Sequence, residues 1–291
     1  MISINSTREK VQRREASTPD LRIVPTIKLV PHELHDQQRS DPLIEDLRRA
    51  GVLKNPPIVA APQPPSDIYV VLDGANRALA MEKLGIEHTL VQVVPYESET
   101  VELQTWYHVI SNLESPNIET RFRQVPDLHV EFASVQHAKA ELARRSIVAY
   151  CLLPDGKAIT LSGGGMDIRE RTTFLHAIVN VYIRSGRLDR TNIDNLGELL
   201  KTYPQLSGAI IFPHYEPVEI MDLAESGLKV PPGLTRHIIH GRALRINYPL
   251  DKLKANLSLE EKNTELNDWV RASFEARQVR FYSESTYLFD E

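Results

Sequence analysis

The chain has 291 residues, of which 42% are hydrophobic and 25% are charged, so it can bury a full core in one large or two ordinary domains. Its formal net charge of -5 and isoelectric point near 6.1 argue against the basic surface that binding to nucleic acid requires. No apolar run reaches the roughly 18 residues of a spanning helix, and residues 1–20 contain no apolar signal core. We therefore expect a cytoplasmic protein without a membrane partner.

The first part of the chain is predicted to form a tail, followed by a strand, a loop and a helix. Residues 1–21 mix charges without apolar periodicity, which predicts a flexible tail. A short strand and a loop are expected in residues 22–36. A helix is then expected to begin at Pro42, directly after an aspartate, and to end at Gly51.

A compact α+β unit is predicted from the pattern that follows. A proline-rich turn at residues 62–67 separates two apolar segments, and a helix ends at Gly85. The expected strands are residues 56–61, 68–72 and 89–94. We assign this unit, residues 22–110, to a first domain.

The remaining residues, 111–291, are expected to form a second mixed α+β domain, because helical and strand patterns alternate without internal repeats. Hairpins are predicted at residues 146–161 and 235–250, and a buried strand at 208–213. Expected helices are residues 134–145, 169–186, 216–227 and 258–277, the last opened by a capping box from Ser258 to Glu261.

The stretch VVLDGANRALAMEKLGI takes the chain from an apolar strand through a glycine turn into an amphipathic helix. A helix that starts directly after Gly74 presents unpaired N–H groups and a positive dipole end, which favour a phosphate. Arg77 in the first turn adds a bidentate donor. Asp73 is placed to hold a Mg²⁺ that bridges phosphate oxygens, or to cap the helix. Spacing alone also allows a structural interpretation, with a cap, a turn and a surface charge.

This stretch resembles the phosphate-binding motif of the ParB/sulfiredoxin superfamily, and within it the free serine kinases, including those of siderophore biosynthesis. The resemblance covers most of residues 22–291 in the same order. It continues through VPTIKLVPHELHD, QTWYHVI, VPPGLTRHIIHGRALRINYPL and RFYSESTYLFD. One departure is Asn76, where some relatives have a histidine, so an imidazole role at that position does not carry over.

The resemblance implies a small ParB/sulfiredoxin-like N-terminal domain and a second mixed α+β domain that closes over the site. It implies transfer of a phosphoryl group from ATP or ADP, with Mg²⁺, to L-serine. The implied site residues are Glu33 and Asp73 for catalysis, with Asp73 also binding the metal; Gly74, Ala75, Asn76 and Arg77 for the nucleotide; and Trp106, Thr235, Arg236 and His237 for serine.

The chemistry of such a reaction gives each implied residue a task. Glu33 would accept the proton of the serine hydroxyl as general base. Thr235 and Arg236 would bind the carboxylate of serine, while His237 would contact substrate or phosphate. Trp106 would form a wall of the pocket, although a core aromatic is an equally good interpretation of this residue.

Two other classes of protein, a DNA-associated regulator and a reductase, are alternative interpretations of the motif. A ParB-like nucleotide-binding regulator associated with DNA should continue into a helix-turn-helix and a basic surface, whereas this chain stays acidic and α+β. A sulfiredoxin-like reductase would need a cysteine beside the phosphate turn, but the only cysteine, Cys151, lies in an apolar run and is expected to be buried. The phosphoryl donor, the pathway, the oligomeric state and any regulation by haem or another ligand are left open by the sequence.

Two further patterns are given structural interpretations. The glycine run in residues 161–170 lacks the G-K-[S/T] ending of a Walker A motif, and we expect a helix entry there. The ten histidines show no firm zinc spacing.

Overall fold

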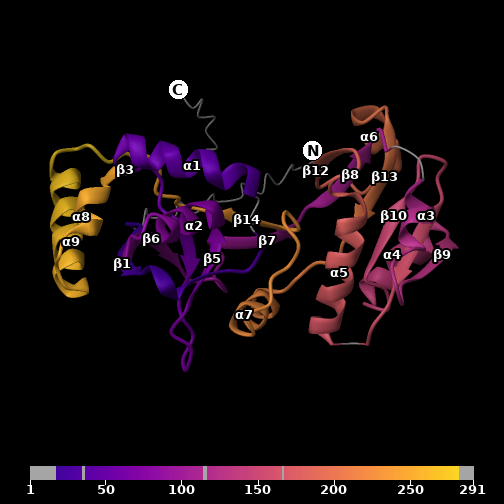
Figure 1. The fold of residues 1–291 in the computed structure, drawn as a ribbon, viewed down its shortest axis with the longest axis horizontal. Coiled ribbons are helices and arrows are strands. Elements are labelled where there is room, and N and C mark those ends of the chain that lie inside the picture. The colour runs from indigo at the N-terminus through magenta and orange to yellow at the C-terminus, as the bar shows by residue number, and fades with distance from the viewer. Residues whose placement is uncertain (1–17, 35–36, 114–116, 166, 282–291) are drawn as a thin grey trace, which may run out of the picture.

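The computed structural model describes residues 18–34, 37–113, 117–165 and 167–281, and it confirms the predicted α+β class (Figure 1). Its strands are β1 Asp20–Pro25, β2 Leu29–Pro31, β3 Val52–Leu53, β4 Ile58–Ala60, β5 Tyr69–Asp73, β6 His88–Val94, β7 Val101–Thr105, β8 Tyr107–Ser111, β9 His129–Ala133, β10 Ala149–Leu152, β11 Ala158–Ser162, β12 Arg187–Thr191, β13 Leu206–Ile211, β14 Thr235–Ile239 and β15 Tyr248–Pro249. Its α-helices are α1 Gln37–Ala50, α2 Ala75–Lys83, α3 Ile118–Phe122, α4 Val135–Ala143, α5 Ile168–Tyr182, α6 Leu196–Thr202, α7 Pro217–Glu225, α8 Leu250–Lys254 and α9 Leu259–Glu275.

The first sheet has the strand order β1-β6-β4-β5-β2. β2 runs parallel to β5, with Pro31 opposite Val71, and β4 runs parallel to β6. Its strands are short apolar runs, and helix α2 contributes buried Ala78 and Met81 to the cores that contain them. The carboxyl ends of β2 and β5 therefore lie at the same edge of the sheet.

The C-terminal helices pack against this first sheet. Leu266 of α9 is fully buried in a cluster with Ile23 of β1 and Tyr248 of β15. The amide of Asn263 accepts the Ile23 N–H at 2.9 Å and donates to the Ile23 carbonyl at 2.8 Å, so it satisfies the edge of β1 as a neighbouring strand would. Helix α9 thus packs against strand β1. The predicted domain boundary at residue 110 stays a prediction.

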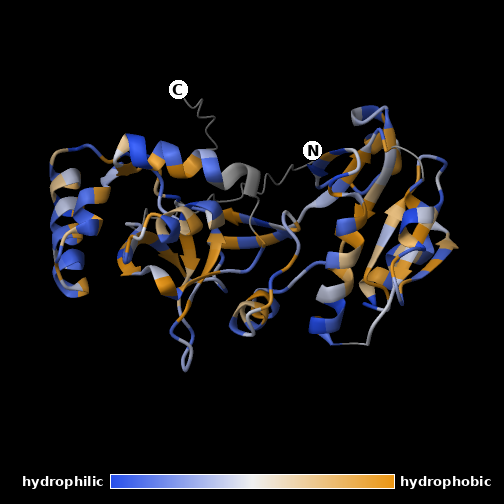
Figure 2. Cartoon of the chain, viewed as in Figure 1, coloured by the Kyte–Doolittle hydropathy of each residue, from blue (hydrophilic) through white to orange (hydrophobic). Residues whose placement is uncertain are grey.

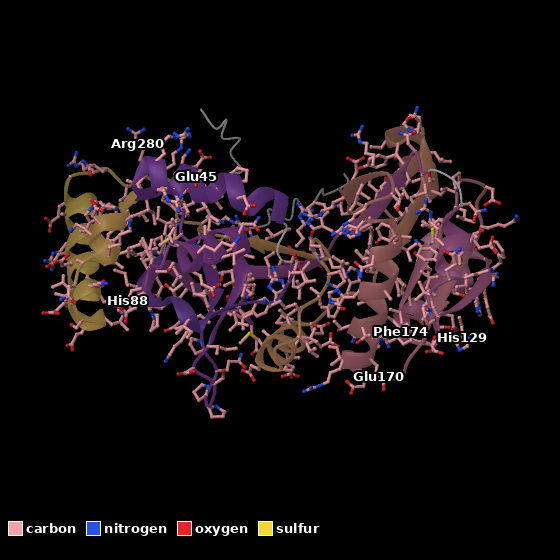
Figure 3. The ribbon with its side chains drawn as sticks, viewed as in Figure 1. Glu45, His88, His129, Glu170, Phe174 and Arg280 are labelled. Carbon is pink, nitrogen blue, oxygen red and sulfur yellow. The ribbon has the colours of Figure 1, made fainter. Side chains whose placement is uncertain are left out.

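A buried ammonium group strengthens the same contact. Lys262 of α9 is only 4% exposed, and its Nζ donates to the carbonyl of Leu253 at 2.6 Å. The same Nζ lies 3.1 Å from Nδ1 of His88, which Figure 3 labels on β6. Burial, together with the charge of Lys262, lowers the pKa of His88 and keeps its ring available as an acceptor.

The second sheet is antiparallel, with the order β12-β8-β13-β10-β11-β9. Its apolar strands lie beneath the more polar outer faces of the helices in Figure 2. Helix α5 buries Leu175 and Ile178 in one core, while α4 and α6 bury Ala138 and Leu199 in another. The sheet is therefore covered on both faces, and the predicted hairpin of residues 146–161 is confirmed.

Between the two sheets, β7 and β14 form an antiparallel ribbon (Figure 1). The predicted hairpin of residues 235–250 is wrong, because β14 pairs with β7, and β15 pairs with β3. The reason lies in the connection, where a turn at His240 and Gly241 is followed by residues 242–247, which form no strand. Gln92 of β6 instead holds it by donating to the Gly241 carbonyl and accepting the Ala243 N–H, both at 2.9 Å. Strand β14 is thereby free to pair elsewhere.

Helix α1 also differs from the prediction, since it begins at Gln37 and contains Pro42 in its interior. Pro42 is the sixth helical residue, beyond the first four whose N–H groups lack a helical partner, so the helix continues through it with the loss of one internal hydrogen bond. The predicted end at Gly51 is confirmed, because its N–H closes the last turn on the carbonyl of Leu47 at 3.0 Å. The capping box from Ser258 to Glu261 is confirmed as well.

The glycine run is a helix entry, as predicted, because α5 begins at Ile168 directly after it. The N–H of Gly165 donates to the carboxylate of Glu170 at 2.5 Å, and Gly163 lies against the ring of Phe174 (Figure 3). The N–H of Gly165 is therefore engaged by the chain itself.

Cys151 is buried in β10, as expected, and burial raises the pKa of its thiol to about 12. Within the described ranges, no helix combines the length and the apolar character that crossing a bilayer would take.

Candidate functional site

The parallel pairing of β2 and β5 brings the segments that carry Glu33 and Asp73 to the same edge of the first sheet. Adjacent strands β2 and β5 are parallel, and Pro31 lies opposite Val71. Glu33 follows Pro31 by two positions, as Asp73 follows Val71. β2 ends at Pro31, and Glu33 forms an isolated bridge with Val230, so the two carboxylates lie beyond the same edge of the sheet without sharing the β2–β5 register.

The phosphate loop, residues 73–77, turns β5 into α2 at Gly74. This residue has φ +90°, and a Cβ on it would lie 2.8 Å from the guanidinium of Arg77, so both the backbone and the space require glycine. No side chain caps α2, whose first N–H groups have no helical partner. Asp73 is therefore not the helix cap, and the helix start remains open to an anion.

Two guanidinium groups converge on Asp73. Its Oδ2 accepts from Arg77 at 3.0 Å and from Arg242 at 3.1 Å. Arg77 is further fixed by donating to the carbonyl of Asn55 at 3.0 Å. Two positive charges against one carboxylate leave a net positive loop, as a phosphate site requires.

Arg242 was not predicted as a site residue. It reaches Asp73 because the segment that carries it is bound at three points. Gln92 holds the residues on either side of it, and Asn55 accepts the N–H of Arg245 at 2.7 Å. No periodic pattern marks this segment in the sequence; its only signal is the pair of arginines after Gly241.

Asn76, in the first turn of α2, has a buried side-chain oxygen for which the described residues offer no donor. A buried acceptor without a partner costs free energy of about 1 to 3 kcal/mol. A ligand that donates a hydrogen bond at this point would remove that cost. Ala75 lies beside it at the helix start.

The base cradle consists of Glu33 and the donors of Gly233 and Thr235. The Gly233 N–H donates to Oε2 at 3.0 Å, and the Thr235 N–H donates to Oε1 at 2.8 Å. The Thr235 hydroxyl contacts Oε1 as well. The Leu34 N–H donates to the Val230 carbonyl, and the Val230 N–H donates to the His32 carbonyl, so the adjoining segments are tied together. The carboxylate is thus held at the edge of β14, about a fifth exposed.

His32 shares a proton with the base cradle. Its Nδ1 lies 2.7 Å from the Val71 carbonyl, which can only accept, so Nδ1 carries a proton. Its Nε2 lies 2.7 Å from the Thr235 hydroxyl, which also contacts Glu33. One hydroxyl proton cannot serve both neighbours, so the second bond needs another proton, on His32 or on Glu33.

His237 lies on the same face of β14 as Thr235. Its Nε2 is 2.8 Å from the Tyr96 hydroxyl, and its ring meets that of His32 edge to face at 5.1 Å. Burial, followed by the positive charges of His32 and Arg242, lowers the pKa of His237 well below its usual range. A neutral imidazole therefore lies beside His32.

Trp106 and Arg236 lie on the opposite face of the ribbon, because successive side chains of a strand alternate. The Arg236 guanidinium is 4.4 Å from the centre of the Trp106 ring. The backbone N–H of Trp106 donates to the carbonyl of Leu234 at 2.8 Å. The structure thus brings Thr235 and His237 to Glu33, and pairs Trp106 with Arg236 on the other side.

The groups around Asp73 determine whether this carboxylate could hold a metal ion. Among the residues that the structure describes, no group of three or more His, Cys, Asp or Glu side chains could hold an ion. Oδ2 of Asp73 is taken by the two arginines, while Oδ1 receives no hydrogen bond from the described residues. This fits a Mg²⁺ held by one carboxylate oxygen and by substrate phosphates, which is how Mg²⁺ is commonly bound.

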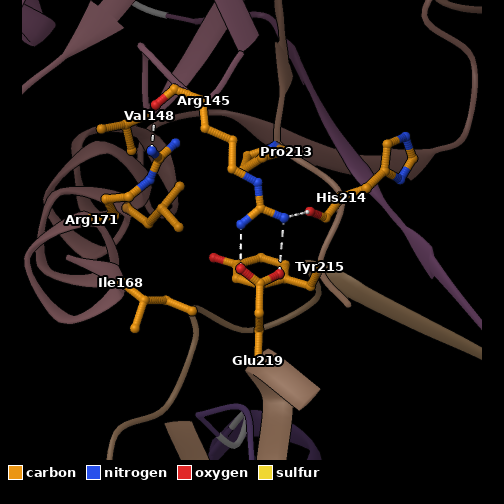
Figure 4. A pocket seen from close by; sticks show the side chains of 9 residues that line it. Arg145, Val148, Ile168, Arg171, Pro213, His214, Tyr215 and Glu219 are labelled. Atoms are coloured by element: carbon orange, nitrogen blue, oxygen red, sulfur yellow. Dashed lines mark hydrogen bonds and ion pairs between the residues drawn. The ribbon is translucent and has the colours of Figure 1, made fainter. Parts of the chain in front are cut away.

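A separate cavity of about 80 Å³, with a mixed polar and apolar lining, lies beside α5 and α7 (Figure 4). Arg145 spans it, donating to Glu219 at 2.9 Å and to the His214 carbonyl at 3.1 Å. Arg171 donates to the carbonyl of Ile147 at 2.9 Å on its wall. None of the predicted site residues lines this cavity. We interpret the ion pair as a structural tie between α7 and the end of α4.

No protein-family model matches the chain. Curated relatives are nevertheless similar over most of its length. An ATP-dependent L-serine kinase of Staphylothermus marinus is 26% identical over 232 residues, which cover 78% of this chain and 88% of that protein. An ADP-dependent L-serine kinase of Thermococcus kodakarensis is 23% identical, covering 84% and 98%. An ATP-dependent L-serine kinase of Staphylococcus aureus is 25% identical, covering 93% and 97%.

Solved structures share the fold. A free serine kinase in complex with AMP matches with a TM-score of 0.67 and 20% identity, covering 82% of this chain and 95% of that one. A C-terminally truncated SbnI from Staphylococcus aureus matches with a TM-score of 0.68 and 21% identity, covering 88% and 97%. The distant relatives of this chain are therefore L-serine kinases that use ATP or ADP, and its architecture is that of a free serine kinase.

Proposed function

We propose that this chain is a free L-serine kinase, which transfers the terminal phosphoryl group of ATP or ADP to L-serine and forms O-phospho-L-serine. One observation carries the proposal: a held carboxylate, Glu33, and a cationic phosphate loop at Asp73 leave adjacent parallel strands at the same edge. The names of the relatives and the shared fold support it. We also propose that the first sheet is a ParB/sulfiredoxin-like domain.

In this mechanism the phosphate loop binds the donor. The open N–H groups after Gly74 and the guanidinium of Arg77 stabilise phosphoryl oxygens, whose charge they complement. The orphaned oxygen of Asn76 accepts a hydrogen bond from the nucleotide. A Mg²⁺ bound at Oδ1 of Asp73 would supply further charge neutralisation at the phosphates.

Glu33 is the general base when the shared proton resides on His32. It accepts the proton of the serine hydroxyl, whose oxygen forms the new bond to phosphorus as the bond to the bridging oxygen of the donor breaks. Thr235 then has a role beyond that predicted, because its hydroxyl joins His32 to Glu33. Serine binding by Trp106, Arg236 and His237 stays part of the proposal.

The test is direct. Purified protein is incubated with L-serine, Mg²⁺ and either ATP or ADP, and the products are followed by phosphorus NMR. We expect a signal of O-phosphoserine with at least one donor, and none when L-serine is omitted. If neither donor yields O-phosphoserine, the kinase proposal is wrong.

A further inference from the structure

A buried polar chain leads from α5 to the base cradle. The Tyr182 hydroxyl lies 2.9 Å from Nδ1 of His108, and Nε2 of His108 lies 3.1 Å from the Gly233 carbonyl. Gly233 in turn donates its N–H to Glu33 at 3.0 Å. Tyr182 and His108 are essentially inaccessible to solvent, at 1% and 0% exposure, so water does not compete for these bonds.

Each proton in this chain has a single possible place. The Gly233 carbonyl can only accept, so Nε2 of His108 donates. Burial lowers the pKa of His108 to about 4; the bond to Gly233 opposes this shift, and the positive charge of Arg190 adds a smaller lowering effect. The ring is therefore neutral at ordinary pH, Nδ1 is an acceptor, and Tyr182 must donate to it.

Gly233 needs an external restraint. Its φ is +77°, and a Cβ at this position would lie 2.1 Å from the guanidinium carbon of Arg190, so the turn is built for glycine. A glycine is also the residue with the greatest backbone freedom. Its N–H nevertheless has to point at Glu33. The bond from His108 to its carbonyl restricts the rotation of this residue.

We propose that His108 and Tyr182 are positioning residues for the catalytic base: by holding Gly233 they aim its N–H, and with it the carboxylate of Glu33, at the substrate hydroxyl. The proposal rests on the kinase function proposed above. It assigns to the second sheet, through β8 and α5, a part in the chemistry without contact to substrate. A misplacement of about 1 Å at a reacting group can cost up to about 100-fold in rate.

Steady-state kinetics with L-serine and nucleotide provide the first test. His108→Leu should lower kcat about 10- to 100-fold while AMP binding, measured by calorimetry, stays within about twofold, because the phosphate loop does not touch Gly233. His108→Gln places an N–H donor at similar reach and should recover most of the loss. Tyr182→Phe should lower kcat by a smaller factor, since Nδ1 loses the hydroxyl that holds the ring in place while the Gly233 carbonyl still accepts from Nε2.

Tyr150→Phe is the matched control, because Tyr150 is as deeply buried, at 1% exposure, in another core and has no contact with His108. It should leave kcat unchanged. A loss of kcat in Tyr150→Phe equal to that in Tyr182→Phe would indicate a general effect of removing buried hydroxyl groups and would overturn the proposal.

A double-mutant cycle separates positioning from mere structural support. If His108 acts only through Glu33, then His108→Gln or His108→Leu in a Glu33→Gln background should cause no further loss of turnover. A full additional loss in that background would overturn the proposal, as would an unchanged kcat in His108→Leu. Should the leucine variant fail to fold, Tyr182→Phe and its combination with Glu33→Gln decide the question.

Nitrogen-15 NMR gives a readout that does not depend on activity. We expect His108 to carry its proton on Nε2 in the wild-type protein and in Tyr182→Phe, with a shifted Nδ1 resonance in the variant because this acceptor loses its hydrogen bond. A proton on Nδ1 would contradict the chain. Absence of O-phosphoserine formation by the wild-type protein would instead refute the kinase function, so the two failures are distinguishable.

Discussion

The phosphate loop and the base cradle both hold a carboxylate at the same edge of the sheet, but they are built from different parts of the chain. Asp73 and Arg77 are neighbours on one turn of a strand-to-helix junction. Glu33 is held by donors that lie 200 and 202 residues away, at Gly233 and Thr235. The loop therefore forms with its own strand and helix, whereas the cradle forms only when a distant segment docks. Nucleotide binding and chemistry should consequently respond to different mutations.

The largest expected effect comes from the base itself. Glu33→Gln should lower kcat about 10²- to 10⁴-fold, because an amide cannot accept the proton of the serine hydroxyl. Binding of AMP, measured by calorimetry, should change little, since the nucleotide contacts are proposed to lie in the phosphate loop.

Glu102→Gln serves as the control, because Glu102 is an exposed carboxylate on β7 that bonds Gln104 instead of the cradle. It should retain wild-type turnover. If Glu33→Gln turns over at the wild-type rate, Glu33 is not the base and the division of labour between cradle and loop fails.

A second expected effect concerns how the free energy of unfolding depends on pH, to which a group on the cradle side contributes. The cradle side contains His108, whose pKa is lowered to about 4 from an unfolded value of 6.5. Below pH 6.5 the unfolded state binds a proton that the folded state refuses until about pH 4, so the free energy of unfolding falls as pH falls through this window. The full contribution is about 3 kcal/mol.

Urea unfolding of the wild type and of His108→Gln, between pH 4 and 7, measures this contribution. The variant lacks the titrating group, so the difference in slope between the two proteins isolates His108 from His237 and His88, which titrate in the same direction. Parallel curves would show that His108 is not held neutral, and the assignment of its tautomer would then be wrong.

The features that the sequence could predict are those built from consecutive residues. The phosphate loop was predictable because strand, glycine, arginine and helix are consecutive, and each has a local physical reason. The helix end at Gly51 and the capping box at Ser258 are local signals too, and both are confirmed. The structure adds that Asp73 binds arginines instead of capping the helix.

The contacts that could not be predicted are all long-range. Arg242 reaches Asp73 only because Gln92 holds its segment through Gly241, 149 residues away in sequence. The partner of β14 was mistaken for the same reason, since strand pairing across a pinned loop leaves no turn signal. The link from Thr235 through its hydroxyl to His32 depends on how β14 docks, which no motif encodes.

A third expected effect falls on the loop side. Arg77→Ala should weaken AMP binding about 10- to 100-fold, the value of one charge-assisted hydrogen bond of about 1.5 to 3 kcal/mol. Asp73→Ala should weaken binding as well, because it releases both arginines. Calorimetry with AMP measures both.

Lys83→Ala, at the other end of α2, removes a half-exposed cation that pairs with Asp41 and should leave the affinity unchanged. Wild-type affinity in Arg77→Ala would place the nucleotide elsewhere, while leaving the test of Glu33 intact.

The smallest expected effect concerns the far face of the ribbon, where Arg236 stacks on Trp106. If this pair receives the carboxylate of serine, Arg236→Ala should raise the KM for L-serine about tenfold, with the KM for nucleotide unchanged. Arg236→Lys should recover only part of the loss, because an ammonium lacks the planar fork of a guanidinium. Since alternation puts Thr235 and His237 on the other face, an unchanged KM for L-serine in Arg236→Ala would move the serine site to their side. Both halves of the reaction would then lie on the face of β14 that already holds Glu33, and the stacked pair would be a structural clasp of the ribbon.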